Sequence, residues 1–317
     1  GAAVINFVGR CNMTGWRIVC DAGGTNLRCA RSDAPSHLAD LMVVAPDNVA
    51  GIEDALEVYA ARFADLEALE GIAIAAAGPV EDGRVRLTNR DIVIDKARVS
   101  RGFANKPVAL LNDLEAAAWS LPVLRSSDLA PILERTGPLG GPRLVVNVGT
   151  GFGGALLVRT ANAWHAIACE PGHMKLAHPW QGGTHIVSVE DVISGLTLSD
   201  PGRRQKYWGH VRSSFPVSGG ALFSALKAGE APADFVSAFS RLLGQVCGDL
   251  VLACGAWGGV YLCGSVAAAW SGAGGTVQFQ SAFEDKGPMA RRMRRVPVFR
   301  ITAANPVLTG LCQVPFA

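Results

Sequence analysis

Residues 20–30 read CDAGGTNLRCA, and residues 147–158 read NVGTGFGGALLV. Each stretch leaves an apolar run, passes through a turn rich in glycine and threonine, and enters a second apolar run. We interpret each as two antiparallel strands joined by a glycine turn. Asp21 and Asn147 occupy the same place in the two stretches. This weak internal repeat predicts an α/β protein with two similar lobes, each of which contributes one glycine turn to a central cleft.

The composition indicates a globular protein with large cores. The chain has 317 residues, of which 49% are hydrophobic and 18% are charged, and its net charge is +2. A charge this small gives no electrostatic reason to expect a nucleic acid or a membrane as a partner. The eight cysteines form no CxxC pair. We therefore expect no zinc site, and we expect reduced thiols in the cytoplasm.

One uncharged stretch, residues 250–270, is long enough to span a bilayer. Glycines at positions 255, 258, 259 and 264 interrupt it. This spacing favours the end of a helix, a glycine turn and a buried strand over a membrane span.

Further elements are predicted from periodicity. Residues 52–69 have the apolar spacing of a helix, residues 71–80 begin as a buried strand, and residues 107–111 form a short apolar strand followed by a helix. Asn112 and Asp113 lie at that last junction. Two interpretations remain open there: the pair caps the helix, or the carboxylate accepts a proton from a substrate hydroxyl at the carboxyl end of the strand.

The glycine turns are candidate anion sites, because a turn rich in glycine directs several backbone N–H groups at one point. In the first turn Gly23 and Gly24 permit close approach, Thr25 adds a hydroxyl, and Asp21 could hold Mg²⁺ through water. Residues 149–151 form the second turn. A third candidate is Gly264, which ends the apolar run 261–263.

The chain resembles the bacterial glucokinase family, within the superfamily of hexokinases and actin-like ATPases. The resemblance extends from about residue 13 to residue 310 and depends on these stretches: DAGGTNLR (21–28), TNRDIVI (88–94), LLNDLEAAAWSLP (110–122), NVGTGFGGALL (147–157), EPGHMKLA (170–177), VEDVISG (189–195), FEDKG (283–287) and VPVFRITAANPVLTG (296–310). Related repressors and kinases carry a cysteine-rich zinc motif after the Gly–His pair. Its absence here indicates the non-zinc branch.

The resemblance implies a two-lobed actin/hexokinase-like (ribonuclease H-like) fold with an interlobe cleft. We expect an N-terminal extension at residues 1–12, a small lobe at 13–122 to which residues 303–317 return, and a large lobe at 123–302. The implied activity is ATP-dependent phosphorylation of glucose at its 6-hydroxyl, with Mg²⁺, by a homodimer. The alternatives are a kinase for another hexose or an amino sugar, and a catalytically weak sugar-binding regulator.

The resemblance also implies roles for individual residues. Asp113 corresponds to the catalytic base. The sugar ligands would be Asn89, Asn112, Asp113, Glu170, His173 and Glu190. The nucleotide and its metal would be held by Asp21, Gly23, Gly24, Thr25, Asn26, Gly149, Thr150, Gly151 and Gly264. Residues 195–225 depart from the family pattern, so no residue is predicted to contact the adenine.

Overall fold

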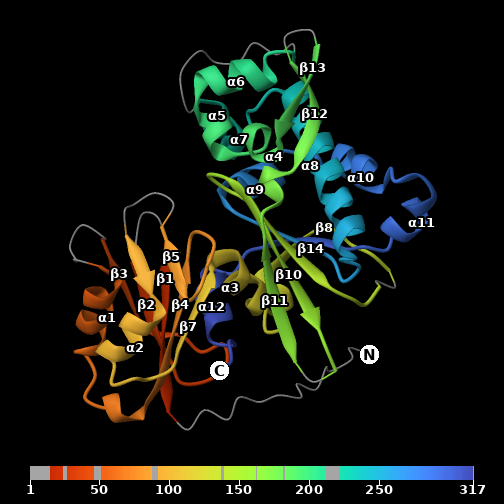
Figure 1. The fold of residues 1–317 in the computed structure, drawn as a ribbon. Helices are drawn as coiled ribbons and strands as arrows, with labels where there is room; N and C mark the ends of the chain where they lie inside the picture. The colour runs from red at the N-terminus through yellow and green to blue at the C-terminus, as the bar shows by residue number, and fades with distance from the viewer. Residues whose placement is uncertain are drawn as a thin grey trace. The chain divides into compact units, whose positions relative to one another are not determined.

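The computed structural model describes residues 15–23, 27–45, 51–87, 92–136, 139–161, 163–180, 183–211 and 221–316 (Figure 1). The chain divides into two compact units. The first comprises Gly1–Leu124, Arg159–Ala168 and Ala304–Ala317, and the second comprises Arg125–Val158 and Cys169–Ala303. The first unit therefore includes residues 159–168, which the expected boundaries assign to the large lobe.

The first unit is built on a five-stranded sheet in the order β3-β2-β1-β4-β7. β1 pairs antiparallel with β2 across the predicted glycine turn, and parallel with β4, which in turn pairs parallel with β7. The strands are β1 (Trp16–Ala22), β2 (Leu27–Ser32), β3 (Ala39–Val44), β4 (Leu69–Ala76) and β7 (Val108–Asn112). All seven residues of β1 are buried, as expected for a central strand whose two faces are both covered.

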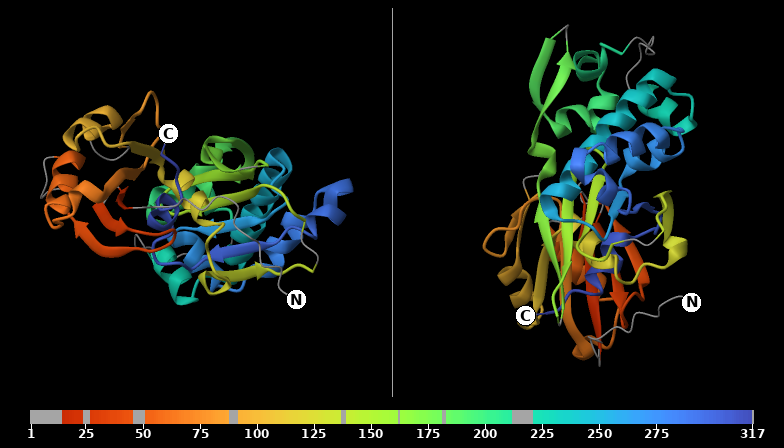
Figure 2. Two further views of the ribbon diagram at one scale, coloured as in Figure 1. Left: turned by 90° about the horizontal axis from the view of Figure 1, so that it is seen from below. Right: turned by 90° about the vertical axis from the view of Figure 1, so that its right-hand side faces the viewer.

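Helices cover both faces of this sheet (Figures 1 and 2). The helices are α1 (Ile52–Ala60) and α2 (Lys96–Gly102) on one face, and α3 (Asp113–Ser120) and α12 (Pro306–Leu311) on the other. Side chains on one face of the sheet, such as Ile18 and Ile72, form a hydrophobic core with α1 and α2. Side chains on the opposite face, such as Val19 and Ala73, form a second core with α3 and α12. The remaining elements are η2 (Leu66–Ala68), β5 (Arg84–Arg86) and β6 (Val93–Asp95).

The C-terminal segment is fastened to the first unit by a buried arginine. Arg17 on β1 is 1% exposed, and its Nη1 donates to the carbonyl oxygens of Cys312 and Val314. The guanidinium also lies 4.6 Å from the centre of the Phe316 ring. These contacts attach residues 312–316 to the central strand.

The second unit is built on a six-stranded sheet in the order β11-β10-β9-β14-β15-β8, although the division into two units assigns residues 164–168 of the edge strand β11 to the first unit. β9 pairs antiparallel with β10 and parallel with β14, which pairs parallel with β15. The strands are β8 (Leu129–Leu133), β9 (Arg143–Val148), β10 (Phe152–Arg159), β11 (Trp164–Cys169), β14 (Val260–Cys263) and β15 (Val298–Ile301). β10, β9, β14 and β15 repeat the order and directions of β2, β1, β4 and β7 in the first sheet, which confirms the predicted duplication.

Several helices pack on this sheet and on one another. The long helix α8 lies against α10, and both contribute to one hydrophobic cluster with β9, β14 and β15. The helices are α7 (Ala221–Ala228), α8 (Ala233–Cys254), α9 (Ser265–Ser271), α10 (Thr276–Glu284) and α11 (Ala290–Met293), with single turns η3 (Ser126–Asp128) and η5 (Gly287–Met289).

The uncharged stretch 250–270 has the structure predicted for it. It contains the end of α8, a left-handed Gly255 at the helix end, β14 and most of α9. Among the described residues α8 alone is long and apolar enough to cross a membrane. Its side chains, including Phe235, Phe239 and Leu243, are buried in the core of the second unit. We therefore interpret α8 as a core helix.

A hairpin and short helices complete the second unit. They are β12 (Lys175–Trp180), β13 (Gly183–Ser188), η4 (Pro171–His173), α4 (Val189–Val192), α5 (Gly195–Ser199) and α6 (Pro201–Trp208). His178 on β12 is 3% exposed, its Nε2 lies 2.6 Å from the carbonyl oxygen of Tyr207, and burial lowers its pKa. This histidine therefore joins the hairpin to α6.

The predicted helix 52–69 is wrong in its second half. α1 ends at Ala60, and the chain then turns so that Asp65 meets β1 and β2. The carboxylate of Asp65 pairs with Arg31 at 2.8 Å, and its carbonyl oxygen accepts a hydrogen bond from the Trp16 indole at 3.1 Å. These tertiary contacts, followed by the start of β4 at Leu69, replace the last two turns of the predicted helix.

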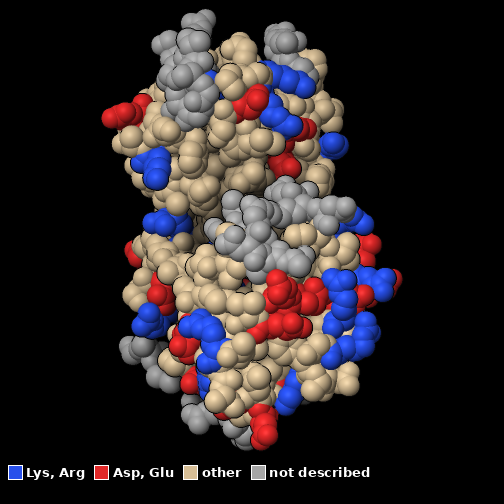
Figure 3. All heavy atoms as spheres, turned by 90° about the vertical axis from the view of Figure 1, so that its left-hand side faces the viewer, with Lys and Arg blue, Asp and Glu red and all other residues tan. Residues whose placement is uncertain are grey.

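The surface carries both signs of charge, in keeping with the small net charge. On the face drawn in Figure 3, basic and acidic side chains occur on the same surface. Some form ion pairs between neighbouring helices, as Arg98 on α2 does with Glu53 on α1 at 2.6 Å. Such exposed pairs contribute little to stability.

Candidate functional site

In the first unit the described site residues Asp21, Asn112 and Asp113 lie at one edge of the sheet. β1, β4 and β7 run parallel, so their carboxyl ends meet at the same edge. Asp21 is paired with Ala75 of β4, and Asn112 is paired with Ala76 of the same strand. In open α/β sheets this edge is where ligands bind.

Asn112 is the N-cap of α3. Its Oδ1 accepts hydrogen bonds from the N–H groups of Leu114 (2.9 Å) and Glu115 (3.3 Å), and its Nδ2 donates to the carbonyl oxygen of Gly78 at 3.2 Å. Asp113 follows as the first helical residue. It is half-buried, and its Oδ1 also accepts from Leu114 N. Asn112 thus performs the capping proposed for this junction, and the carboxylate of Asp113 stands in the first turn beside it.

Asp21 is an almost buried carboxylate at the end of β1. It is 6% exposed, and Arg28, directly opposite on β2, places its Nη2 3.3 Å from Oδ2. Burial raises the pKa of Asp21, and the charge of Arg28 opposes that increase. Gly23 follows the strand within the described residues. The predicted residues Gly24, Thr25, Asn26 and Asn89 lie outside them.

In the second unit, the turn between β9 and β10 is held by the start of α5. Within the turn, Gly149 N donates to Gly151 O at 3.0 Å. From α5, Gly195 N donates to Gly149 O at 2.7 Å and Leu196 N donates to Thr150 O at 3.1 Å. Thr150 is exposed. The turn is therefore a fixed loop with its middle residue open to solvent.

Glu190 lies directly against this turn. It is the second residue of α4, and its Oε2 accepts a hydrogen bond from Phe152 N at 2.8 Å. A Cβ atom on Gly151 would collide with that same carboxylate oxygen. Glycine at position 151 therefore allows the carboxylate of Glu190 to keep this position.

The segment containing Glu170 and His173 packs on the same place. Glu170 precedes η4 and His173 ends it. A Cβ on Gly172 of η4 would collide with the carbonyl oxygen of Phe152 and lie 3.4 Å from Cβ of Glu190. Glu170 and His173 are both exposed. The segment that carries Glu170 and His173 thus packs beside Glu190 at the turn after β9.

Gly264 lies at the edge of the second sheet from which the turn after β9 emerges. It follows β14, whose last residue, Cys263, is paired with Asn147 of β9. A Cβ on Gly264 would collide with the Asn147 side chain and would lie 2.5 Å from the carbonyl oxygen of Val148. Gly264 therefore adjoins the strand end from which the second turn emerges.

The described residues offer no complete protein cage for a metal ion. No group of three or more histidine, cysteine, aspartate or glutamate side chains among them could hold one. Mg²⁺ often keeps several waters and binds through one or two carboxylates together with substrate phosphates. The single, almost buried carboxylate of Asp21 fits that mode of binding.

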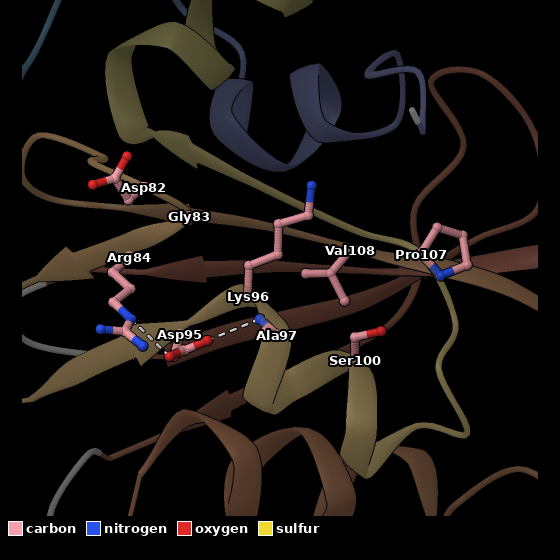
Figure 4. Close-up of a pocket in the computed structure, with 9 residues that line it drawn as sticks. All are labelled: Asp82, Gly83, Arg84, Asp95, Lys96, Ala97, Ser100, Pro107 and Val108. Carbon is pink, nitrogen blue, oxygen red and sulfur yellow. Dashed lines mark hydrogen bonds and ion pairs between the residues drawn. The ribbon is translucent and has the colours of Figure 1, made fainter.

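A surface pocket of about 570 Å³ lies elsewhere in the first unit (Figure 4). It is formed by the β5–β6 hairpin, α2 and the start of β7. Charged side chains line it, including Asp82 and Lys96, and Arg84 is directed toward Asp95, with which it pairs at 2.8 Å. Val108 lines it at the amino end of β7, whereas Asn112 ends that strand. None of the predicted site residues that the structure describes lines this pocket.

Sequence reasoning missed three contributors to the site. They are the backbone N–H of Phe152, the glycine at position 172 and the glycine at position 195. Each acts through a backbone group or through the absence of a side chain, so residue type alone gives no direct indication. The sequence did indicate the start of the helix that carries Glu190. SVED (188–191) has the pattern of a capping box, and Ser188 and Asp191 form one at the start of α4.

Known proteins resemble the chain over almost its whole length. A family model described as Glucokinase matches residues 18–314. The glucokinase of Nitrobacter hamburgensis is 30% identical over 330 residues, covering 96% of this chain and 98% of its own. A crystal structure of glucokinase from an Antarctic psychrotroph has a TM-score of 0.77 at 25% identity and covers 94% of this chain and 98% of that one. The ROK family glucokinase from Streptomyces griseus, solved with glucose and AMPPNP, has the same fold, with a TM-score of 0.61 at 20% identity over 94% of this chain and 98% of its own.

Proposed function

The chain belongs to the glucokinase family, and we infer that it transfers the γ-phosphoryl group of ATP to the 6-hydroxyl of glucose, forming glucose 6-phosphate. The observation that supports this most directly is the family match over residues 18–314. The second unit supports it, since the carboxylate of Glu190 lies against a glycine turn and the segment that carries Glu170 and His173 packs beside it.

We propose that glucose is bound by Glu170, His173, Glu190 and Asn112, with Asn89 as a further contact. Glucose presents many hydroxyls and no charge. A carboxylate accepts hydrogen bonds from pairs of hydroxyls, and charged acceptors bind them more strongly than neutral ones. The exposed side chains of Glu170 and His173 are available to a ligand.

We assign Asp113 as the general base. Its carboxylate would accept the proton of the 6-hydroxyl as the oxygen attacks the γ-phosphorus and the bond to the β-phosphate oxygen breaks. Phosphoryl transfer depends mainly on positioning and on charge stabilisation.

The phosphates of ATP are assigned to the two glycine turns. Asp21 with residues 23–26 forms the first, Gly149, Thr150 and Gly151 form the second, and Gly264 adjoins the second. Backbone N–H groups in such turns bind anionic oxygens. Asp21 would hold Mg²⁺ through water, and the bound ion would neutralise charge on the phosphates.

Other properties follow from the same assignment. ATP and the reduced thiols indicate a cytoplasmic enzyme, and membership of the family indicates a homodimer. A preference for another hexose, or for an amino sugar, would require only a few changed contacts around the sugar, because hydroxyl recognition depends on individual hydrogen bonds.

The test is turnover by the wild-type chain and by Asp113→Asn, measured through ADP release with glucose, other hexoses and amino sugars. Asn keeps the size of the side chain but cannot accept the proton. We expect kcat with glucose to fall by roughly 10²- to 10⁴-fold while glucose still binds. Asp285→Asn, an exposed aspartate after α10, is the matched control and should retain full turnover. Normal turnover by Asp113→Asn would refute the base assignment. Glucose binding without ADP release by the wild type would favour the regulator.

A further inference from the structure

A buried polar network joins the two short helices that adjoin the second turn. Ser194 and Thr197 are both 0% exposed. The hydroxyl of Thr197 donates to the carbonyl oxygen of Asp191 at 2.8 Å and accepts from the hydroxyl of Ser194 at 3.2 Å. The backbone N–H of Thr197 donates to the Ser194 hydroxyl at 3.2 Å. These bonds connect α5 to the end of α4.

The network connects two different parts of the site. At one end, α4 presents Glu190, whose carboxylate accepts from Phe152 N. At the other, the first residues of α5 hold Gly149 and Thr150 through two backbone hydrogen bonds. The proposed sugar ligand and the proposed nucleotide turn are therefore attached to the two halves of one segment, residues 189–197.

Capping of α5 does not account for the Thr197 hydroxyl. The cap requires only the Ser194 hydroxyl and the backbone N–H of Thr197. The additional bond from the Thr197 hydroxyl runs back to Asp191, in a helix of four residues. A helix that short is not stable by itself. The hydroxyl is thus placed to hold α4 against α5.

The other end of α4 is also fixed. The Ser188 hydroxyl donates to the carboxylate of Asp191 at 2.7 Å, and Asp191 N donates back to that hydroxyl at 3.2 Å. With Ser188 at its start and Thr197 near its end, α4 is held on both sides. Glu190 lies between these two attachments.

We propose that Thr197 is a positioning residue that sets Glu190 and the turn 149–151 as one rigid element, so that glucose and nucleotide binding are energetically coupled. The inference depends on the proposed function for the identity of the two ligands. Thr197 contacts neither ligand in this scheme. Coupling of this kind is reciprocal: bound glucose should raise the affinity for nucleotide by the same factor as bound nucleotide raises the affinity for glucose.

The experiment compares Thr197→Val, which removes the hydroxyl at constant shape, with Thr197→Ser, which keeps it. Calorimetry would give glucose affinity with and without AMPPNP, and AMPPNP affinity with and without glucose. Thr197→Val should weaken glucose binding about tenfold, the equivalent of one lost hydrogen bond. It should also bring the coupling factor close to one, whereas Thr197→Ser should behave as the wild type.

Thr160→Val is the matched control. Thr160 is exposed, and its hydroxyl donates to the carbonyl oxygen of Ala163 at 3.0 Å, so this variant loses a similar bond outside the network. Its affinities and coupling should not change. A loss of stability in Thr197→Val with unchanged affinities and coupling would show a purely structural role and overturn the proposal.

A second variant covers the case in which Thr197→Val does not fold. Gly195→Ala would place a methyl group 2.7 Å from Gly149 O and displace the turn. The proposal requires both AMPPNP and glucose affinity to fall; a fall in AMPPNP affinity alone would overturn it. If the wild type binds both ligands without turnover, the proposed function is refuted, but the affinities of the variants still test the proposal for Thr197. Binding of neither ligand would refute both.

Discussion

Replacing Gly151 with alanine would separate two explanations of the second glycine turn. If glycine is there to admit a phosphate, Gly151→Ala should chiefly weaken ATP binding. The structure gives a different reason, because a Cβ at this position would collide with Oε2 of Glu190. The carboxylate would have to move away and lose its 2.8 Å hydrogen bond from Phe152 N. We therefore expect the main defect in sugar binding.

The size of the defect follows from that bond. A hydrogen bond to a charged group contributes about 1.5–3 kcal/mol. If Glu190 binds the sugar only in the orientation set by Phe152 N, the KM for glucose should rise roughly 10- to 150-fold. The KM for ATP should change less, because the bonds from α5 to Gly149 and Thr150 do not involve the new methyl group.

Steady-state kinetics with a coupled assay for glucose 6-phosphate would measure both constants. Gly140→Ala is the matched control, because a Cβ at Gly140 meets no atom within 4 Å. It should leave both KM values unchanged. If Gly151→Ala raises the KM for ATP and leaves that for glucose unchanged, Gly151 serves the phosphate and the explanation through Glu190 is wrong.

Two further predictions concern stability. Arg135→Gln should lower the free energy of unfolding in urea by about 1–3 kcal/mol, because this ion pair at 2.6 Å joins two side chains that are only 11% and 14% exposed. Arg84→Gln breaks an ion pair whose arginine is 68% exposed and should have a smaller effect. Equal effects would contradict the burial argument. Burial lowers the pKa of His178 in the folded chain. Below about pH 6.5 the imidazole therefore binds a proton in the unfolded chain before it does so in the folded chain. The free energy of unfolding should thus decrease as the pH falls below this value. In His178→Gln, whose amide can still donate to Tyr207 O, thermal unfolding between pH 7.5 and 5 should depend less on pH, and an unchanged dependence would exclude His178 as a cause.

Elements formed by residues close together in sequence were predicted correctly. The glycine turn after Asp21 and the one after Asn147 each join two antiparallel strands, as predicted. The helix 52–69 failed because its second half is decided by contacts distant in sequence. Asp65 is bound by Arg31, 34 residues away, and by Trp16, 49 residues away. Apolar spacing cannot detect such contacts.

The site shows the same division. Asn112 was predictable as a helix cap because its partners lie two and three residues away. The partner of Glu190 is a backbone N–H 38 residues earlier, and a backbone N–H is present at almost every position. Residue type therefore indicated that Glu190 is a candidate ligand and gave no information about what orients it.

The duplicated architecture also shows how the two turns, both assigned to the phosphates of ATP, differ in the acidic side chain beside them. Asp21 and Asn147 are each the next-to-last residue of equivalent strands, β1 and β9. In the first unit this position supplies a carboxylate, which suits a hydrated cation on phosphates. In the second unit it is an amide, and the nearby carboxylate comes from Glu190 on a helix that follows the β12–β13 hairpin. That acid accepts the backbone N–H of Phe152. On the proposed assignments, a duplicated strand–turn–strand unit would thus supply an acid for a hydrated cation in one copy and a backbone-oriented acid for a neutral ligand in the other.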